Sequence, residues 1–208
     1  MYGVLGDNKD VVGVAFFVTP RYALTVCHNI FGCKTGTSVT LQNSENHSVA
    51  TRVTHCDRTH DLAVLEPQDS GFRSEFLVTE QIGRNVAIEE FTLVTFGLSL
   101  EHLEGGVEFD PGVVYHVASI LKTTAHHISY ESSSFDGDSS GALVLRKNGH
   151  VVGMHISTVN RARELKRMKE VDDRLGDIEE SVDTLIKSTA NACLALRMDV
   201  FATVWPDG

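Results

Sequence analysis

The sequence predicts an all-β protein built in two halves. Short apolar segments rich in β-branched and aromatic residues recur through residues 11–157 of the 208-residue chain, as in proteins made of many short strands. Turn residues separate these segments, and no stretch of convincing helical periodicity interrupts them. We therefore expect two sets of strands, at residues 1–80 and 81–208, divided within residues 67–90.

The individual strands follow one another at spacings typical of a barrel or sandwich. Asn148-Gly149 separates two of them and predicts a tight hairpin. Gly105-Gly106 and Asp110-Pro111-Gly112 predict two further turns. The first half is expected to hold strands at residues 11–19, 21–26, 38–42, 48–55 and 62–66, and the second half at 91–97, 113–121, 127–130, 142–147, 151–157 and 192–198.

Residues 160–190 differ in composition from everything before them. They are dense in charged residues, and their apolar residues recur at alternating steps of three and four, which predicts a helix inserted before the last strand. Two interpretations remain open: the helix packs on the β-body with a charged outer face, or it mediates oligomerisation or binds a partner. The apolar positions are Met168, Val171, Leu175, Ile178, Val182 and Leu185.

Composition narrows the classes of function. A formal charge of −10, from 18 basic and 28 acidic residues, argues against a general nucleic-acid binder. The longest apolar runs are strand-length, far below the roughly 20 residues that a membrane span needs. Residues 1–18 lack the basic start of a secretory signal. We expect an intracellular, cytoplasmic chain without nucleic-acid or membrane partners, or a domain of a larger protein.

The four cysteines, at positions 27, 33, 56 and 193, are too few and too scattered for a disulfide framework. We expect free thiols in a reducing compartment. A metal site formed by Cys27, His28 and Cys33 would lack a fourth ligand and the usual paired spacing. The prediction is therefore a protein with no metal and no cofactor.

Three segments carry residues suited to hydrolytic chemistry. His28 directly follows an apolar strand, Asp61 opens another, and Ser139 lies in a Gly-flanked turn before a third. Each feature alone is common in proteins of every kind. Together they occur in the order His, Asp, Ser, which is one of the orders in which a Ser-His-Asp triad is built, and residues prone to form a strand follow the serine.

These landmarks resemble, in the same order, those of the trypsin/chymotrypsin-like (clan PA) serine proteases. The resemblance implies two six-stranded antiparallel β-barrels with the helix as an insertion, and a site in the cleft between the barrels. Asn29 stands where secreted members carry a disulfide cysteine, so that disulfide is not expected. Ser140 replaces the fourth residue of Gly-Asp-Ser-Gly-Gly and is a rival nucleophile to Ser139. The similar segments are residues 13–18, 25–28, 61–65, 137–141 and 151–155, followed by a last strand at 192–200.

The resemblance implies a role for each of these residues. Ser139 is the nucleophile, and His28 is the general base that takes its proton. Asp61 is the acceptor that orients the imidazole. The backbone N–H groups of Gly137 and Ser139 form the oxyanion hole. Asp57 is a rival to Asp61, although it lies in a polar run and not at the start of an apolar strand.

The resemblance also implies which residues line the S1 pocket. Ser133 stands where trypsin-type enzymes carry an acid, so specificity for Arg or Lys is not expected. His155 and Ser134 are similar to the S1 histidine and hydroxyl of glutamyl endopeptidases and picornavirus-type proteases, which predicts Glu or Gln at P1. A protonated His155 favours Glu and a neutral one favours Gln, and the sequence does not choose. In the alternative, His155 is a packed strand histidine.

The function predicted from the sequence is a serine endopeptidase with a narrow range of protein or peptide substrates. An alternative from another class is a catalytically silent protease-fold module used for binding or scaffolding. A third hypothesis, a carboxylester hydrolase on a different fold, requires a Gly-x-Ser elbow that enters a helix.

Overall fold

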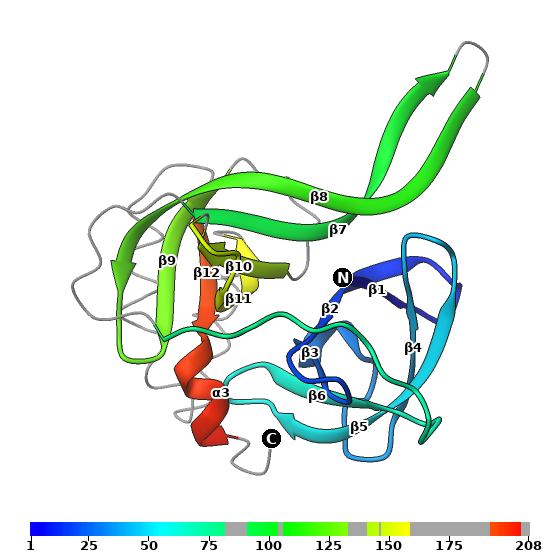
Figure 1. The fold of residues 1–208 in the computed structure, drawn as a ribbon, viewed down its shortest axis with the longest axis horizontal. Coiled ribbons are helices and arrows are strands. Elements are labelled where there is room, and N and C mark those ends of the chain that lie inside the picture. Colours follow the sequence, from blue (N-terminus) through cyan, green and yellow to red (C-terminus); the bar gives the residue numbers. More distant parts are fainter. Residues whose placement is uncertain (82–90, 104–105, 133–140, 146, 159–191, 205–208) are drawn as a thin grey trace.

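The computed structural model describes residues 1–81, 91–103, 106–132, 141–145, 147–158 and 192–204. These residues form two closed six-stranded antiparallel β-barrels and a short C-terminal helix (Figure 1). The all-β prediction and the double-barrel architecture are confirmed. No helix in the described part of the chain is long and apolar enough to span a membrane.

The first barrel has the strand order β1-β2-β3-β6-β5-β4. Its strands enclose a core of aliphatic, aromatic and cysteine side chains, among them Phe17, Leu41 and Leu65. The sequence analysis missed β1, because a four-residue strand that contains a glycine gives too short an apolar pattern to recognise. The bounds are β1 Tyr2–Leu5, β2 Val11–Phe17, β3 Ala23–Val26, β4 Ser38–Gln42, β5 Ser48–Asp57 and β6 Leu62–Pro67.

The second barrel has the strand order β10-β11-β12-β9-β8-β7. Phe91, Tyr130 and Leu143 are completely buried in its core. Each predicted strand of this half has a counterpart in the structure, although β7 and β8 are longer than expected. The bounds are β7 Phe91–Leu103, β8 Gly106–Thr123, β9 His127–Ser132, β10 Gly141–Leu145, β11 Val151–Thr158 and β12 Ala192–Arg197.

The long strands β7 and β8 form a two-stranded ribbon that extends beyond the barrel (Figure 1). The turn predicted at Asp110-Pro111-Gly112 is wrong, because these residues lie inside β8 and pair with Ser99, Leu98 and Gly97. Both strands of a two-stranded ribbon are edge strands, and edge strands tolerate a proline that cannot donate to a ladder.

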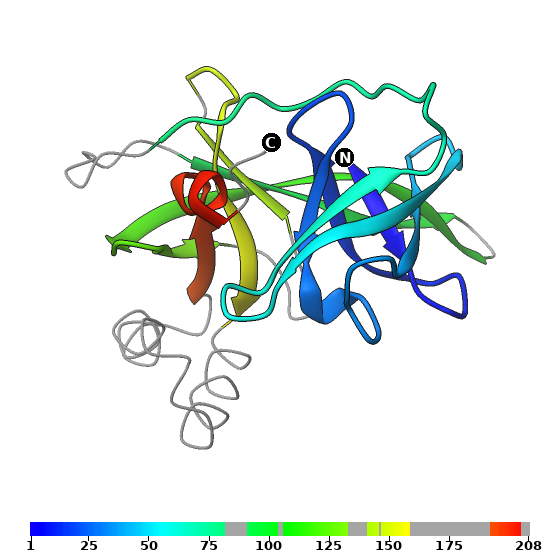
Figure 2. The same cartoon turned by 90° about the horizontal axis from the view of Figure 1, so that it is seen from below.

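An apolar cluster joins the two barrels. Phe16 and Leu24 of the first barrel share it with Ala142, Met154 and Leu196 of the second, and all five are buried. Strand β10 contacts β2 directly across this junction, and Figure 2 shows the two barrels side by side. Burial of apolar surface between the barrels therefore fixes their relative position.

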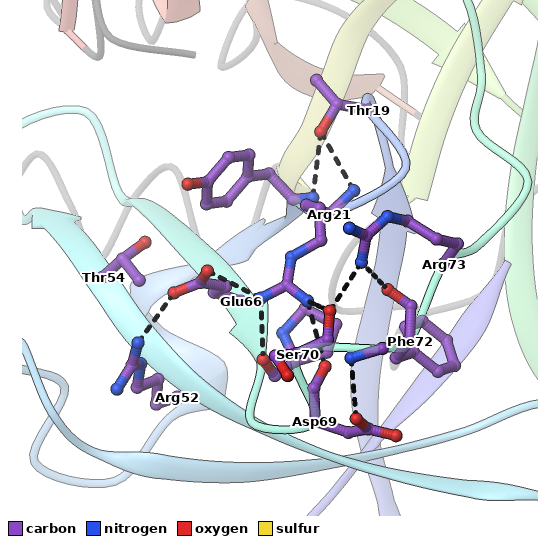
Figure 3. Close-up of polar contacts among 12 residues, drawn as sticks. Thr19, Arg21, Arg52, Thr54, Glu66, Asp69, Ser70, Phe72 and Arg73 are labelled. Carbon is purple, nitrogen blue, oxygen red and sulfur yellow. Dashed lines mark hydrogen bonds and ion pairs between the residues drawn. The ribbon is translucent and has the colours of Figure 1, made fainter.

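Arg21 anchors the start of the connection between the barrels. Its guanidinium donates to the carbonyl oxygens of Asp69 and Ser70 at 3.0 and 2.8 Å, and it pairs with Glu66 at 2.8 Å (Figure 3). Arg52 contacts the other oxygen of Glu66 at 3.0 Å. These bonds cross-link β6 to the chain that leaves it.

The connection then passes from one barrel to the other over two residues. The amide of Leu77 donates to the carbonyl of Phe17 in the first barrel at 2.8 Å. The next residue, Val78, accepts from the amide of Val151 in the second barrel at 2.8 Å, and Glu80 donates to the Val151 carbonyl at 2.8 Å. The boundary predicted between residues 80 and 81 falls just after this crossing.

The predicted helix at 160–190, including its suggested role in oligomerisation, lies outside the described residues. The chain does form helix α3, Met198–Val204, which the sequence did not predict. Met198 and Val200 are buried in the cluster between the barrels. Helices this short owe their stability mainly to tertiary packing, so their sequence pattern is weak.

Candidate active site

Strand pairing brings His28 and Asp61 together. His28 lies in η1, the 3-10 turn Cys27–Asn29 that directly follows β3. Asp61 directly precedes β6, and β3 pairs with β6 so that Val26 lies opposite Leu62. The ladder continues one step further, because the amide of Cys27 donates to the Asp61 carbonyl at 3.1 Å.

Both carboxylate oxygens of Asp61 accept hydrogen bonds from His28. The backbone N–H of His28 donates to Oδ1 at 3.0 Å, and the distance from imidazole Nδ1 to Oδ2 is 2.5 Å. A carboxylate can only accept, so Nδ1 carries the proton of this pair. In the neutral imidazole, Nε2 is then the basic nitrogen. The arrangement therefore holds His28 in the tautomer that a general base needs.

Asp57, the rival acceptor in the sequence analysis, builds the turn that presents Asp61. Its Oδ1 accepts from the amides of Thr59 and His60 at 2.8 and 3.3 Å, and its Oδ2 lies 2.7 Å from Nδ1 of His60. Burial raises the pKa of the Asp57 carboxyl, but the hydrogen bonds from His60 and Thr59 outweigh it, and the net pKa is lowered. The carboxylate of Asp57 is thus engaged with His60.

The backbone at Asp61 has a left-handed conformation, with φ of +56°. Asp and Asn adopt this region more readily than most side chains, because a short polar side chain can bond locally. Here both side-chain oxygens bond to His28. The same residue therefore supports the turn before β6 and orients the imidazole.

Asn29 occupies the space beside the histidine turn. A Cβ added to Gly13 on β2 would lie 1.8 Å from Nδ2 of Asn29. Glycine at position 13 thus allows the asparagine side chain to pack on β2.

A broad hollow of about 1130 Å³ lies beside His28. Its walls come from the β1–β2 turn, strand β4 and the chain from Asn29 to Phe31. Phe31 is almost fully exposed, at 94% of its surface. The hollow therefore borders the histidine turn on the side of the first barrel.

Strand β10 begins two residues after the predicted nucleophile, Ser139. Gly141, its first residue, pairs with His155 of β11, and a Cβ added there would lie 2.7 Å from the Val94 carbonyl oxygen. Close packing therefore requires glycine at this position. The predicted site residues Ser133, Ser134, Gly137 and Ser139, and the rival Ser140, lie outside the described residues.

His155 is completely buried on β11. The hydroxyl of Tyr130 lies 2.6 Å from its Nδ1. The sequence analysis missed Tyr130, because β12 separates β9 from β11 and no local pattern joins residues on strands that are not paired. Cross-strand register carries the only signal: Tyr130 pairs with Cys193, and His155 pairs with Ala195, two residues along the same strand.

The side chains of Cys27, His28 and Cys33, which were weighed as a metal set from the sequence, do not converge on one point. The ring of His28 is turned to Asp61, whereas Cys27 and Cys33 gather around Cys56. All four cysteines are free thiols. Burial raises the pKa of Cys33 to about 12 and raises that of Cys27 as well, and hydrogen bonding to Cys56 adds to both shifts.

Comparisons with solved structures identify proteases of the same architecture. An inactive serine-to-alanine mutant of Rv3671c from M. tuberculosis has a TM-score of 0.63 and 14% identity, with 99% of this chain and 84% of that chain covered. The MamO protease domain from Magnetospirillum magneticum has a TM-score of 0.60 and 15% identity, covering 97% and 93%. The active form of the Rv3671c protease has a TM-score of 0.59 and 14% identity, covering 99% and 77%.

At these identities the structural similarity establishes the fold alone. No curated protein matches the chain in sequence. The family described as the trypsin-like peptidase domain matches residues 13–154, which include both members of the His28–Asp61 pair and most of the two barrels. The chain therefore belongs to the trypsin-like peptidase domain family.

Proposed function

We propose that the protein is a serine endopeptidase in which Ser139 attacks the peptide carbonyl, His28 takes its proton and Asp61 orients His28. The observation that carries the proposal is the pair of hydrogen bonds from His28 to Asp61. One bond fixes the backbone of the histidine turn and the other fixes the ring. A base held in this way needs no reorientation when it receives the serine proton.

Chain connectivity supports the role proposed for Ser139. It lies two residues before Gly141, so their Cα atoms are at most about 7.6 Å apart. Gly141 opens β10, which contacts β2 of the first barrel, and β2 pairs with β3, the strand that leads to His28. This neighbourhood supports a serine within reach of the imidazole.

Proton transfer in this arrangement runs in two directions. As Oγ of Ser139 attacks, Nε2 of His28 takes its proton, and the imidazolium is stabilised by the Asp61 carboxylate. The amides of Gly137 and Ser139 receive the oxyanion of the tetrahedral intermediate. His28 then returns the proton to the leaving amine, and water repeats the sequence to release the acyl group. Protein or peptide chains are the substrates that this fold serves.

We infer specificity for Gln or Glu at P1, with His155, Ser133 and Ser134 as S1 residues and Tyr130 as the group that orients His155. A phenolic hydroxyl that donates to Nδ1 leaves the proton of a neutral imidazole on Nε2. That N–H can donate to the side-chain carbonyl of Gln. The contact with Tyr130 therefore supports Gln as the preferred residue.

The complete burial of His155 equally suits the alternative of a packed strand histidine. The variant Tyr130→Phe separates the two. An orienting hydroxyl predicts a higher KM for Gln substrates with a smaller change in kcat. If P1 scanning with a peptide library shows a preference for Arg, Lys or Leu, or no effect of Tyr130→Phe on KM, His155 is a packing residue.

The experiment that tests catalysis is labelling by a fluorophosphonate probe. Wild-type protein is expected to react at one residue, and peptide mapping by mass spectrometry identifies it. Ser139→Ala should abolish labelling, whereas Ser140→Ala should retain it. Retained labelling in Ser139→Ala together with loss in Ser140→Ala would move the nucleophile by one residue. Absence of labelling in folded wild-type protein would favour the catalytically silent binding module.

A further inference from the structure

Three thiols from separate segments lie close together next to the turn that carries His28. Cys27 begins η1, Cys33 lies in the loop that follows, and Cys56 is near the end of β5. The sulfur of Cys56 lies 3.1 Å from that of Cys27 and 3.1 Å from that of Cys33. All three sulfurs lie within 4.8 Å of one another. Cys27, Cys33 and Cys56 are called the thiol cluster below.

The spacing of the thiol cluster fits the ligands of one metal ion. Zinc–sulfur bonds of about 2.3 Å in tetrahedral geometry place neighbouring sulfurs about 3.8 Å apart. The observed separations of 3.1 Å at two of the three pairs need to widen by about 0.7 Å to reach this spacing, which small side-chain rotations provide. Buried cysteines that serve only as small apolar side chains have no need to place three sulfurs this close together.

An open hollow gives access to the thiol cluster. Its volume is about 620 Å³, and Cys33 and Cys56 form part of its wall. Within the described residues, the group of metal-ligating atoms contains three members, all of them sulfurs. A fourth position on a tetrahedral ion therefore falls to a water from the hollow, as in zinc sites that keep one position open.

The charges around the hollow suit a thiolate site. Three thiolates and one divalent ion carry a net charge of −1. Lys34 and Arg58 line the same hollow, and the Arg58 guanidinium donates to the Cys33 carbonyl at 2.9 Å. His55 and Asp57 line it as well, and the Asp57 carboxylate is engaged by the Thr59 amide and the His60 ring. Positive groups beside the cluster offset that negative charge. They would instead repel a divalent ion held by neutral ligands, because such a site keeps the positive charge of the ion.

We propose that Cys27, Cys33 and Cys56 bind a thiophilic divalent metal ion of the zinc class, with a water from the hollow as fourth ligand. The ion ties the histidine turn to its following loop and to β5. It thereby restrains Cys27, which is bonded covalently to His28. Binding to the folded state alone also stabilises the protein in proportion to the logarithm of the metal concentration. The proposal does not depend on Ser139 being the nucleophile.

The test is a zinc titration of the full chain, fully reduced and free of oxygen, against a chromogenic zinc indicator. Wild-type protein should bind one equivalent. Cys56→Ser should bind zinc at least about 100-fold more weakly. Removing a ligand lowers metal affinity at least as much as removing a residue that only supports a ligand. Cys193→Ser is the control, since Cys193 is a free thiol that lies in the second barrel, away from the thiol cluster, and it should bind as wild type does.

Cadmium provides a second measurement that does not depend on activity. Its thiolate charge-transfer absorbance should reach the level of three thiolates in wild type and in Cys193→Ser. If Cys56→Ser fails to fold by circular dichroism, Cys33→Ser, in the loop after the histidine turn, replaces it. Absence of saturable binding, or equal binding by the cluster variant and the control, overturns the proposal. A disulfide between two of these cysteines in the protein as isolated, with no metal binding after reduction, also overturns it.

Discussion

The substitution Asp61→Asn tests the central contact of the site. Both oxygens of Asp61 accept from His28, one from the backbone N–H and one from the ring. An asparagine side chain offers one acceptor and one donor. If its carbonyl keeps the backbone bond, its amide faces Nδ1 and donates to it, so the imidazole must carry its proton on Nε2. That tautomer cannot take a proton from serine.

The expected loss is large because the wrong tautomer removes general-base catalysis. Tautomer errors of this kind lower the rate of a triad enzyme by about 10⁴-fold, which corresponds to about 5 kcal/mol of barrier. Folding should change far less, because asparagine also tolerates the positive φ of this position. The lost charge-assisted bond is expected to lower the free energy of unfolding by no more than about 3 kcal/mol.

The assay is the second-order rate of fluorophosphonate labelling, with urea unfolding measured on the same samples. Asp57→Asn is the matched control. Its amide oxygen can still accept from Thr59 and His60, and the carboxylate it replaces bonds to His60, so labelling should stay within about tenfold of wild type. A folded Asp61→Asn protein that labels within tenfold of wild type would refute the reasoning. An equal loss in Asp57→Asn would refute it as well.

Three further predictions concern stability and the connection between the barrels. Gly141→Ala should lower the free energy of unfolding by about 1–3 kcal/mol, because the new Cβ meets the Val94 carbonyl. Thermal unfolding measures this loss as a fall in melting temperature of about 2–4 °C per kcal/mol. The control is Gly71→Ala, whose Cβ meets only a side-chain oxygen. Hydrogen bonds from Arg21 and Arg52 lower the pKa of Glu66 below 4.5, so its ion pairs stabilise the fold above that value and lose this effect as pH falls through the lowered pKa. Urea unfolding of Glu66→Gln should therefore differ from wild type at neutral pH, by less than about 1 kcal/mol per pair, and converge with it in acid. Arg21→Ala removes the bonds to Asp69 and Ser70 and should speed limited proteolysis near these residues, whereas Arg52→Ala should not; equal cleavage rates would show that Arg21 does not anchor the connection.

Much of the fold was predictable because the strands carry their own signal. Strands such as Ser38–Gln42 and Leu62–Pro67 are bounded by turn residues and rich in β-branched and aliphatic side chains, which is sufficient to locate them. The signal failed where pairing replaced local preference. Asp110-Pro111-Gly112 has the composition of a turn, yet β7 holds it in an extended ribbon.

The candidate site was predictable to the extent that its residues stand at strand ends. His28 after β3 and Asp61 before β6 are adjacent because these two strands pair. The contact of Tyr130 with His155 was not predictable, since β12 lies between their strands. The convergence of three cysteines was equally hidden, because residues 27, 33 and 56 share no motif.

The sequence by itself determined the class of fold and the positions of most strands, because both depend on local composition, and the family resemblance indicated which histidine and aspartate belong together. Only the tertiary structure decided that Asp57 serves His60, that Tyr130 reaches His155 and that three thiols share one place. Those contacts depend on how closed barrels set the register of strands distant in sequence. That register is fixed by packing of the whole core, and no short segment encodes it.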